Sequence, residues 1–182
     1  MAKMEVGMKF IDFDYITPWD GTKNFYEMAK GKKTIVKFLR YYGCRMCQID
    51  ILEMEEEYGK IEAEGANLFV VLQSAPETIQ EEYKEERPPF QYILDPEMKL
   101  YKELEIGDKQ EVTDEALLAK GAAKRAKMQE LQLEHGKYEG NEQQAPATFV
   151  LDEDMNVKYA KYGLVSYDTP SVDELVEILK SF

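Results

Sequence analysis

The chain has 182 residues, of which 44% are hydrophobic and 32% charged, a balance that suits one globular domain and excludes a disordered chain. Its 36 acidic residues outnumber its 23 basic ones, so a formal net charge of −13 argues against nucleic acid as a partner. The apolar run at residues 68–72 is far too short to cross a bilayer, and no membrane association is expected. The N-terminus lacks the apolar stretch of a signal peptide, so we expect a cytoplasmic location, where thiols stay reduced.

Hydrophobic periodicity and turn residues divide the chain into alternating strands and helices. The expected elements, in chain order, are helix 24–30, strand 33–39, helix 44–64, strand 67–73, helix 77–86, strand 90–94, helix 99–104, helix 113–135, strand 147–151, strand 157–162 and helix 171–182. The last two strands read as a hairpin, with Asn156 suited to a left-handed turn position. This order predicts an α/β sandwich with a mixed sheet, in which strands 33–39 and 67–73 are parallel.

The only two cysteines, Cys44 and Cys47, form a single C-x-x-C motif where the first of these strands meets its helix. A closed zinc site needs about four ligands, so metal binding would require His135 and a carboxylate to join the pair, and no metal is expected. Two buried, inert cysteines are another possibility. A redox-active dithiol is the interpretation that the spacing favours, because a helix N-terminus stabilises a thiolate.

The position of each cysteine predicts its role. Cys44 faces the free N–H groups of the first helical turn, and Arg40 and Arg45 are nearby cations, so Cys44 is the expected nucleophile and is expected to be exposed. Cys47 lies one turn further along, where we expect it to be more buried and to resolve the mixed disulfide. Tyr42 is a candidate to line the substrate groove.

A second part of the site is expected at Ala145-Pro146, which opens strand 147–151. A proline fits the first position of a strand because it has no N–H to donate. We expect a cis bond here, which would offer the backbone of Ala145 to a bound substrate.

These motifs together resemble the thioredoxin superfamily, and in particular its peroxiredoxin-like branch, the alkyl hydroperoxide reductase/thiol-specific antioxidant (AhpC/TSA) type. The resemblance rests on the segments Val6–Phe13, Phe38–Cys47 and Pro146–Asp154, which are similar to the opening G-x-x-x-P-D-F, the F-L-R-x-x-G-C-x-x-C and the P-x-T-F-V-I-D-x-D of that branch. It implies a thioredoxin-like three-layer α/β/α sandwich over residues 1–182, with a helical insertion at about 107–144. The chain departs from the peroxiredoxin P-x-x-x-T-x-x-C, since Lys37 and Tyr41 stand at the proline and threonine positions.

The resemblance implies a thiol–disulfide oxidoreductase or peroxiredoxin-like antioxidant protein that reduces disulfides or peroxides through Cys44 and Cys47. Arg40 is expected as a third catalytic residue, because it ends the strand that leads to Cys44 and its cation can reach the thiolate. Ala145, Pro146, Tyr42 and Arg45 would contact the substrate. No nucleotide-binding glycine motif is present, so no cofactor is expected, and electrons would come from an external thiol reductant such as a thioredoxin system. The alternatives are a non-catalytic binding module with the same fold, or a cysteine-based metal-binding protein.

Overall fold

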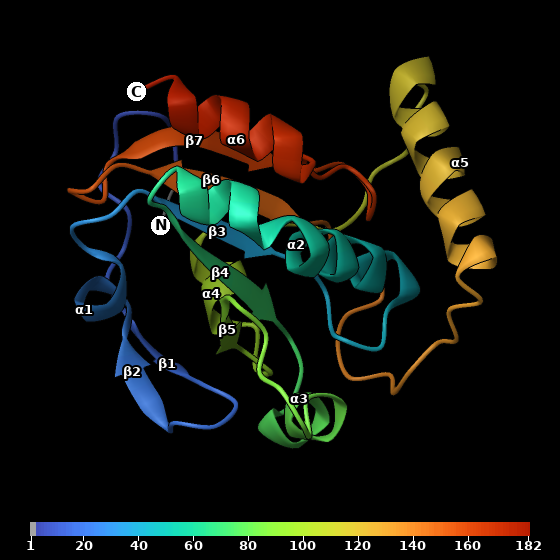
Figure 1. The fold of residues 1–182 in the computed structure, drawn as a ribbon. Helices are drawn as coiled ribbons and strands as arrows, with labels where there is room; N and C mark the ends of the chain where they lie inside the picture. The colour runs from blue at the N-terminus through green and yellow to red at the C-terminus, as the bar shows by residue number, and fades with distance from the viewer. Residues whose placement is uncertain (1–2) are drawn as a thin grey trace.

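The computed structural model describes residues 3–182, and its strands form one seven-stranded mixed sheet in the order β2-β1-β5-β4-β3-β6-β7 (Figure 1). The strands are β1 (Asp14–Ile16), β2 (Thr22–Asn24), β3 (Thr34–Phe38), β4 (Asn67–Leu72), β5 (Gln91–Leu94), β6 (Ala147–Leu151) and β7 (Val157–Tyr162). The helices are α1 (Phe25–Ala29), α2 (Arg45–Ala63), α3 (Pro76–Glu82), α4 (Lys99–Glu103), α5 (Glu115–Glu130) and α6 (Val172–Lys180).

Strand β3 lies at the centre of the sheet and leads into the C-x-x-C motif. It pairs in parallel with β4, with α2 as the crossover, and antiparallel with β6 on its other side. All five of its residues are buried, because a central strand with helices on both faces has no exposed side. The predicted α/β class, mixed sheet and parallel first crossover are therefore confirmed.

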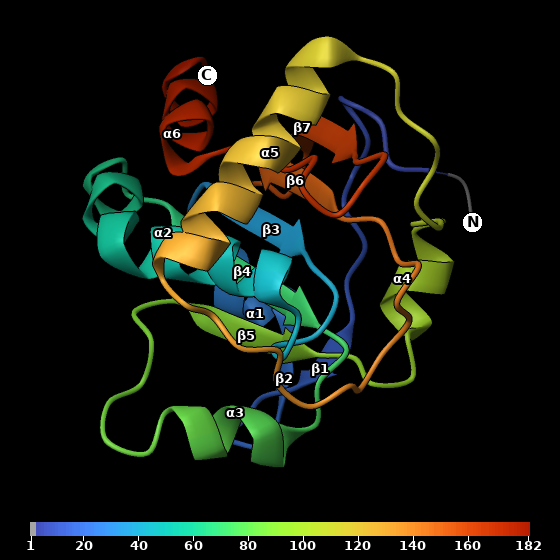
Figure 2. The same ribbon diagram turned by 90° about the vertical axis from the view of Figure 1, so that its right-hand side faces the viewer.

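Two apolar clusters, one on each face of the sheet, make up the core. Helices α2 and α6 cover one face and pack on side chains such as Ile35 and Val70. Helices α1 and α4 cover the other face, where Phe38 and Phe69 meet Phe25 and Tyr101. The result is the three-layer α/β/α sandwich that the resemblance implied (Figures 1 and 2).

The start of α6 and the turn between β6 and β7 test two predictions made from local sequence patterns. Ser171 begins α6 with a capping box, in which its hydroxyl and the Glu174 side chain each bond the other's backbone N–H. In the β6–β7 turn, Met155 adopts the left-handed conformation, with φ of 66°, so the expectation for Asn156 was wrong. Asn156 instead bonds the carboxylate of Asp152 across the turn.

The β1–β2 hairpin was not predicted. Each strand has only three residues, and the apolar/polar alternation is too short to detect. The hairpin reaches the sheet through a single pairing of Ile16 with Leu94 of β5. No helix within residues 3–182 is long and apolar enough to span a membrane.

Helix α5 belongs to the stretch between α4 and β6, and both views place it beyond the C-terminal end of β3 (Figures 1 and 2). The two ends of this stretch meet, since Lys109 N–H bonds the Gln143 carbonyl at 2.6 Å and Ala145 N–H bonds the Gly107 carbonyl at 3.0 Å. Gly121 lets α5 lie against Tyr167, whose ring atoms would be 2.7 Å from an added Cβ. The chain then leaves α5 and passes the loop between β3 and α2.

Candidate active site

The C-x-x-C motif begins helix α2. Cys44 is the N-cap residue, and its sulfur accepts the backbone N–H of Cys47 at 3.5 Å. The β3–β4 ladder continues past the end of β3, where the Arg40 carbonyl accepts the Gln73 N–H at 2.7 Å. This fixes the short loop 41–43 that delivers Cys44 to the helix, and it confirms the predicted position of the motif.

Arg40 joins the cysteine to a distant part of the chain. Its Nη2 donates to the Cys44 sulfur at 2.9 Å, and its Nη1 donates to the backbone carbonyl of Glu142 at 2.6 Å. The Nε of the same guanidinium is buried and has no partner. The side chain is only 11% exposed, so its charge is compensated mainly by what it touches inside the site.

The two sulfurs have opposite pKa shifts. A hydrogen bond from the Cys47 thiol, the charge of Arg40 and the Cys47 N–H together lower the pKa of Cys44 to about 6, against the opposing effect of burial. Burial raises the pKa of Cys47 well above that of an ordinary thiol, and the neighbouring Cys44 raises it further. Cys44 is thus a thiolate near neutral pH, and Cys47 a protonated thiol that donates to it.

Cys47 is buried as expected, but Cys44, which was expected to be exposed, is buried as well. Cys44 is 1% exposed and Cys47 2%, so the expected contrast between an accessible and a sheltered cysteine was wrong. A segment far away in the sequence, residues 134–144, follows α5 and contacts the residues that lead into the motif, with Gly136 bonded to Gly43 and the Glu142 carbonyl bonded to Arg40. We call it the cover segment.

Several contacts hold the cover segment in place. Gly136 N–H bonds the Gly43 carbonyl at 2.9 Å, and the Tyr41 hydroxyl bonds the Glu142 carboxylate and lies 3.2 Å from His135 Nε2. At the far end, Asn141 N–H bonds the Gln73 side chain at 2.7 Å. Sequence reasoning gave Gly136, Asn141 and Glu142 no role, because they lie in a polar loop about ninety positions from the cysteines, and it considered His135 only as a metal ligand.

A second anchor is Glu139, whose carboxylate accepts the Thr78 hydroxyl at 2.6 Å and the Ala75 N–H at 3.1 Å. This ties the middle of the cover segment to the start of α3. The segment is therefore fastened to the loops that follow both β3 and β4, the two parallel strands whose carboxyl ends form this edge of the sheet.

The expected cis bond before Pro146 is absent, since residues 3–182 contain no cis peptide. The physical reason lies in the backbone pairing on each side. The Ala145 N–H is taken by the Gly107 carbonyl, and the Pro146 carbonyl accepts the Gly163 N–H at 2.8 Å. With both groups paired inside the protein and Ala145 buried, a trans bond satisfies the backbone at the start of β6.

The structure shows no hydrogen bond between the other candidates, Arg45 and Tyr42, and either sulfur among the described residues. Arg45 is exposed on the first turn of α2, and half-buried Tyr42 donates its backbone N–H to the Ser74 hydroxyl at 2.8 Å. His135 stacks on Tyr138 with ring centroids 3.8 Å apart. Within the described part of the chain, no cluster of three or more His, Cys, Asp or Glu side chains is arranged to hold a metal ion.

A buried ion network lies along α2 beyond the cysteines. Asp50 is 3.8 Å from the Lys37 ammonium of β3 and 2.5 Å from the Lys124 ammonium of α5, and it accepts the Thr169 hydroxyl at 3.1 Å. Burial alone would raise the pKa of Asp50, but the two ammonium groups lower it. Lys124 of α5 is therefore paired inside the protein, with its side chain only 12% exposed.

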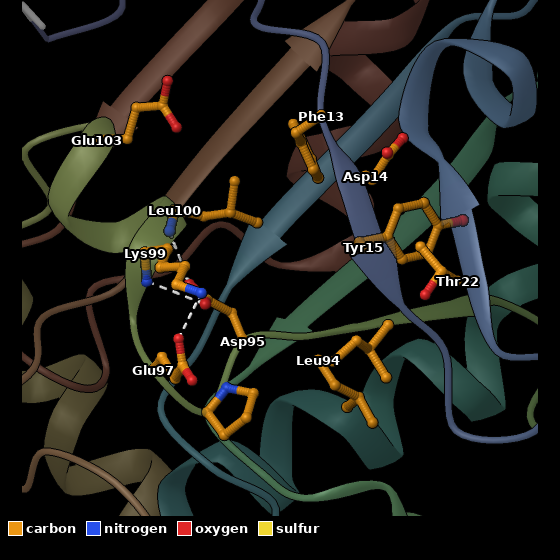
Figure 3. Close-up of a pocket in the computed structure, with 12 residues that line it drawn as sticks. Phe13, Asp14, Tyr15, Thr22, Leu94, Asp95, Glu97, Lys99, Leu100 and Glu103 are labelled. Atoms are coloured by element: carbon orange, nitrogen blue, oxygen red, sulfur yellow. Dashed lines mark hydrogen bonds and ion pairs between the residues drawn. The ribbon is translucent and has the colours of Figure 1, made fainter.

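A cavity of about 400 Å³ lies away from these residues, between β1, the end of β5 and α4 (Figure 3). Asp95 sits at its floor and caps α4 by accepting the N–H groups of Lys99 and Leu100. None of the predicted site residues lines this cavity.

The mixed sheet is covered by helices on both faces, and a low-pKa cysteine lies at the N-terminus of the crossover helix. This combination is that of a thiol protein with a thioredoxin-like fold. The AhpC/TSA family model matches residues 6–160, and the chain belongs to this family. No curated protein sequence gives a significant match to the chain.

Solved structures with the same fold include peroxidoxin BcpB from Mycobacterium tuberculosis, with a TM-score of 0.70 and 12% identity over 98% of each chain. A putative thiol:disulfide interchange protein DsbE from Chlorobium tepidum has a TM-score of 0.62 and 13% identity, covering 97% of this chain and 99% of its own. A cysteine-to-serine mutant of peroxiredoxin 6 from Arenicola marina has a TM-score of 0.70 and 13% identity, covering 98% of this chain and 73% of its own.

Proposed function

We propose that the protein is a thiol-dependent oxidoreductase in which Cys44 attacks the substrate and Cys47 resolves the product. The proposal rests on the environment of the Cys44 sulfur. This sulfur accepts hydrogen bonds from the Arg40 guanidinium and the Cys47 N–H, and the pKa of Cys44 is lowered to about 6. A nucleophilic thiolate and a protonated thiol one helical turn apart are what thiol–disulfide exchange needs.

With a disulfide substrate, the Cys44 thiolate attacks one sulfur, a Cys44–substrate disulfide forms and the other sulfur leaves as a thiolate. With a peroxide, the thiolate attacks one oxygen, the O–O bond breaks and Cys44 becomes a sulfenic acid while hydroxide or alkoxide leaves. In either case Cys47 loses its proton and attacks the Cys44 sulfur, which closes an intramolecular disulfide. With a disulfide substrate the Cys44–substrate bond breaks and the second substrate sulfur leaves as a thiolate; with a peroxide the S–O bond of the sulfenic acid breaks and its oxygen leaves as water, taking up the Cys47 proton. An external dithiol then reduces that disulfide, and both cysteines return to the starting state.

Free thiols and this cycle fit a reducing compartment such as the cytoplasm, where a thioredoxin-type reductant is available. The proposed antioxidant role follows if peroxides are the oxidant. Arg40 would hold the thiolate in place, and Arg45 and Tyr42 remain candidates for contacts with a substrate.

The test compares the two single-cysteine variants with the wild type. Cys44→Ser should lose turnover of both hydrogen peroxide and an insulin-type disulfide. Cys47→Ser should still attack and should accumulate a mixed disulfide, because resolution is lost. Mass spectrometry of the oxidised wild type should show the loss of two hydrogens, and a trapped adduct on Cys44→Ser would reverse the assignment.

A non-catalytic binding module is the competing function, and the burial of both sulfurs is the observation that favours it. A binding module should turn over neither oxidant and should keep the same partner affinity in both cysteine variants. The relative rates with peroxide and insulin in the wild type therefore separate the two functions and identify the preferred oxidant.

A further inference from the structure

A second cavity, of about 250 Å³, lies between α2, α5 and the residues that lead into α6. Helix α5 packs against α2 here, and the cavity opens beside this contact (Figure 2). It shares no lining residue with the cavity of Figure 3, and neither cysteine lines it. This part of the molecule therefore takes no part in the proposed redox cycle.

The walls of this second cavity are mainly apolar. Ile49 of α2 and Ala123 of α5 line it, together with Lys120, Lys124 and Lys127, which follow one another at intervals of four and three residues on one face of α5. The methylene stems of lysines add apolar surface while their ammonium groups reach the rim. Apolar walls with a few convergent polar groups are typical of cavities that bind small molecules.

Most of the charged groups around the cavity already have partners inside the protein. The Lys124 ammonium bonds the Asp50 carboxylate at 2.5 Å and the Thr169 hydroxyl at 2.9 Å, and the Lys120 ammonium donates to the Thr169 carbonyl. The Glu53 carboxylate accepts a backbone N–H at the start of α6 at 3.2 Å. A cationic ligand would therefore find both carboxylates of the cavity occupied.

Lys127 is the exception. Its side chain is half-buried at the cavity, and it makes no ion pair or hydrogen bond with any of residues 3–182. The charged groups gathered here are four ammonium groups, from Lys37, Lys120, Lys124 and Lys127, and three carboxylates, from Asp50, Glu53 and Glu174. One positive charge is thus uncompensated, although the whole chain carries a net charge of −13.

We propose that this cavity binds a small organic acid, whose carboxylate pairs with Lys127 and whose apolar body packs against Ile49 and Ala123. A carboxylate supplies the missing negative charge, and its hydrogen bonds to an ammonium group are stronger than neutral ones. The volume is below the roughly 300–1,000 Å³ of cavities for drug-sized ligands, so the ligand is a short-chain or single-ring acid.

An inorganic anion suits the cavity less well. Phosphate gains nothing from the apolar walls, and its second negative charge would lie near the carboxylates of Asp50 and Glu53. The affinity for an organic acid should instead increase with the length of its chain, since each buried methylene adds to the free energy of binding.

Titration of the reduced protein with the carboxylates from acetate to hexanoate tests the proposal, with the amide NMR signals of α2 and α5 as the measurement. The dissociation constant should fall about fourfold for each added methylene until the cavity is filled. The shifts should centre on Ile49 and Ala123. Phosphate at the same ionic strength should bind more weakly than hexanoate.

Three variants locate the ligand. Lys127→Met should weaken hexanoate binding by at least about tenfold, the effect of one hydrogen bond to a charged group. Arg125→Met is the matched control, because it removes the same charge from α5 at a side chain that lies over the Tyr167 ring and does not line the cavity. Ala123→Leu keeps every charge and fills the cavity from an exposed helical position, so it should also abolish binding.

Several results would overturn the proposal. Equal affinities for acetate and hexanoate, or tighter binding of phosphate than of hexanoate, would exclude an apolar body in the cavity. Equal losses in Lys127→Met and Arg125→Met would mean a general attraction to the charge of α5. Full binding by Ala123→Leu, or no binding of any of these acids to the wild type, would leave the cavity without this ligand. None of these measurements depends on turnover, so their outcome is separate from that of the proposed function.

Discussion

Gly43 and Gly136 meet backbone to backbone, with the Gly136 N–H donating to the Gly43 carbonyl at 2.9 Å. A Cβ added to Gly136 would lie 2.9 Å from the Gly43 Cα, and one added to Gly43 would collide with the Lys137 carbonyl. Gly43 immediately precedes the candidate nucleophile. This contact therefore brings the cover segment against the residue that precedes Cys44, and it depends on two residues without side chains.

The first prediction concerns this contact. Gly136→Ala should push the cover segment away, raise the rate of Cys44 alkylation severalfold and cost about 1–3 kcal/mol of stability through overpacking. Alkylation by iodoacetamide and urea denaturation are the two measurements. Gly59→Ala is the matched control, because nothing lies within 4 Å of its added Cβ and an exposed helical site should gain roughly 0.5–1 kcal/mol. An unchanged alkylation rate in Gly136→Ala would contradict the prediction.

The second prediction separates the two arginines near the motif. Arg40→Met removes the cation that contacts the Cys44 sulfur, so the pKa of Cys44 should rise by about 1–3 units and the thiolate fraction at neutral pH should fall. The pH profile of iodoacetamide alkylation reports this directly. Arg45→Met is the control, since Arg45 is exposed and solvent screens its charge. Equal profiles in both variants would remove Arg40 from the site.

The third prediction links stability to pH. The pKa of Cys44 is lowered from 9.0 to about 6 in the folded protein, so its thiolate stabilises the fold above the unfolded pKa and that contribution is lost as the pH falls toward about 6. The free energy of unfolding of the reduced protein should therefore rise between about pH 6 and pH 8, by at most about 1.4 kcal/mol per unit.

Urea denaturation with reductant present measures this slope. Cys44→Ser lacks the titrating thiol, so its stability should change less over the same range. Parallel curves for the two proteins would show that Cys44 is not a thiolate in the fold. The range stops at about pH 8 because the raised pKa of Cys47 contributes with the opposite sign above the ordinary thiol pKa.

The fourth prediction concerns the buried ion network. Asp50→Asn leaves Lys37 buried without a carboxylate and should cost about 3–5 kcal/mol. Lys124→Met should cost less, because Asp50 keeps Lys37 and Thr169 as partners. Lys127→Met, one turn further along α5, should change stability by no more than about 0.5 kcal/mol.

Chemical denaturation of the three variants gives the order. Adding Lys37→Met to Asp50→Asn should recover part of the loss, since both buried charges are then removed together. If Lys124→Met lowered the free energy of unfolding more than Asp50→Asn does, the prediction would be contradicted. The main contribution of the network would then be to hold α5 and not to compensate the charge of Lys37.

Local patterns in the sequence were sufficient for the elements and for the position of the dithiol. The β-branched run of β3, the three-and-four spacing of α2 and the Ser171 cap are short-range signals, and each produced the element expected. A C-x-x-C between such a strand and such a helix places Cys44 at an N-cap wherever the fold is formed. The family resemblance could also be recognised from the sequence, because its motifs are short continuous segments.

The environment of Cys44 could not be predicted from the sequence, because it is formed by residues that are distant from Cys44 along the chain. Arg40, which contacts the sulfur, is bound by the backbone of Glu142. The backbone around Pro146 pairs with Gly107 and Gly163, and the partner of Lys124 comes from α2. Which sulfur is charged could be predicted from the chain, through the helix end and the arginine four residues away. That this sulfur is covered emerges only in the folded molecule, because contacts between distant loops leave no periodic trace in the chain.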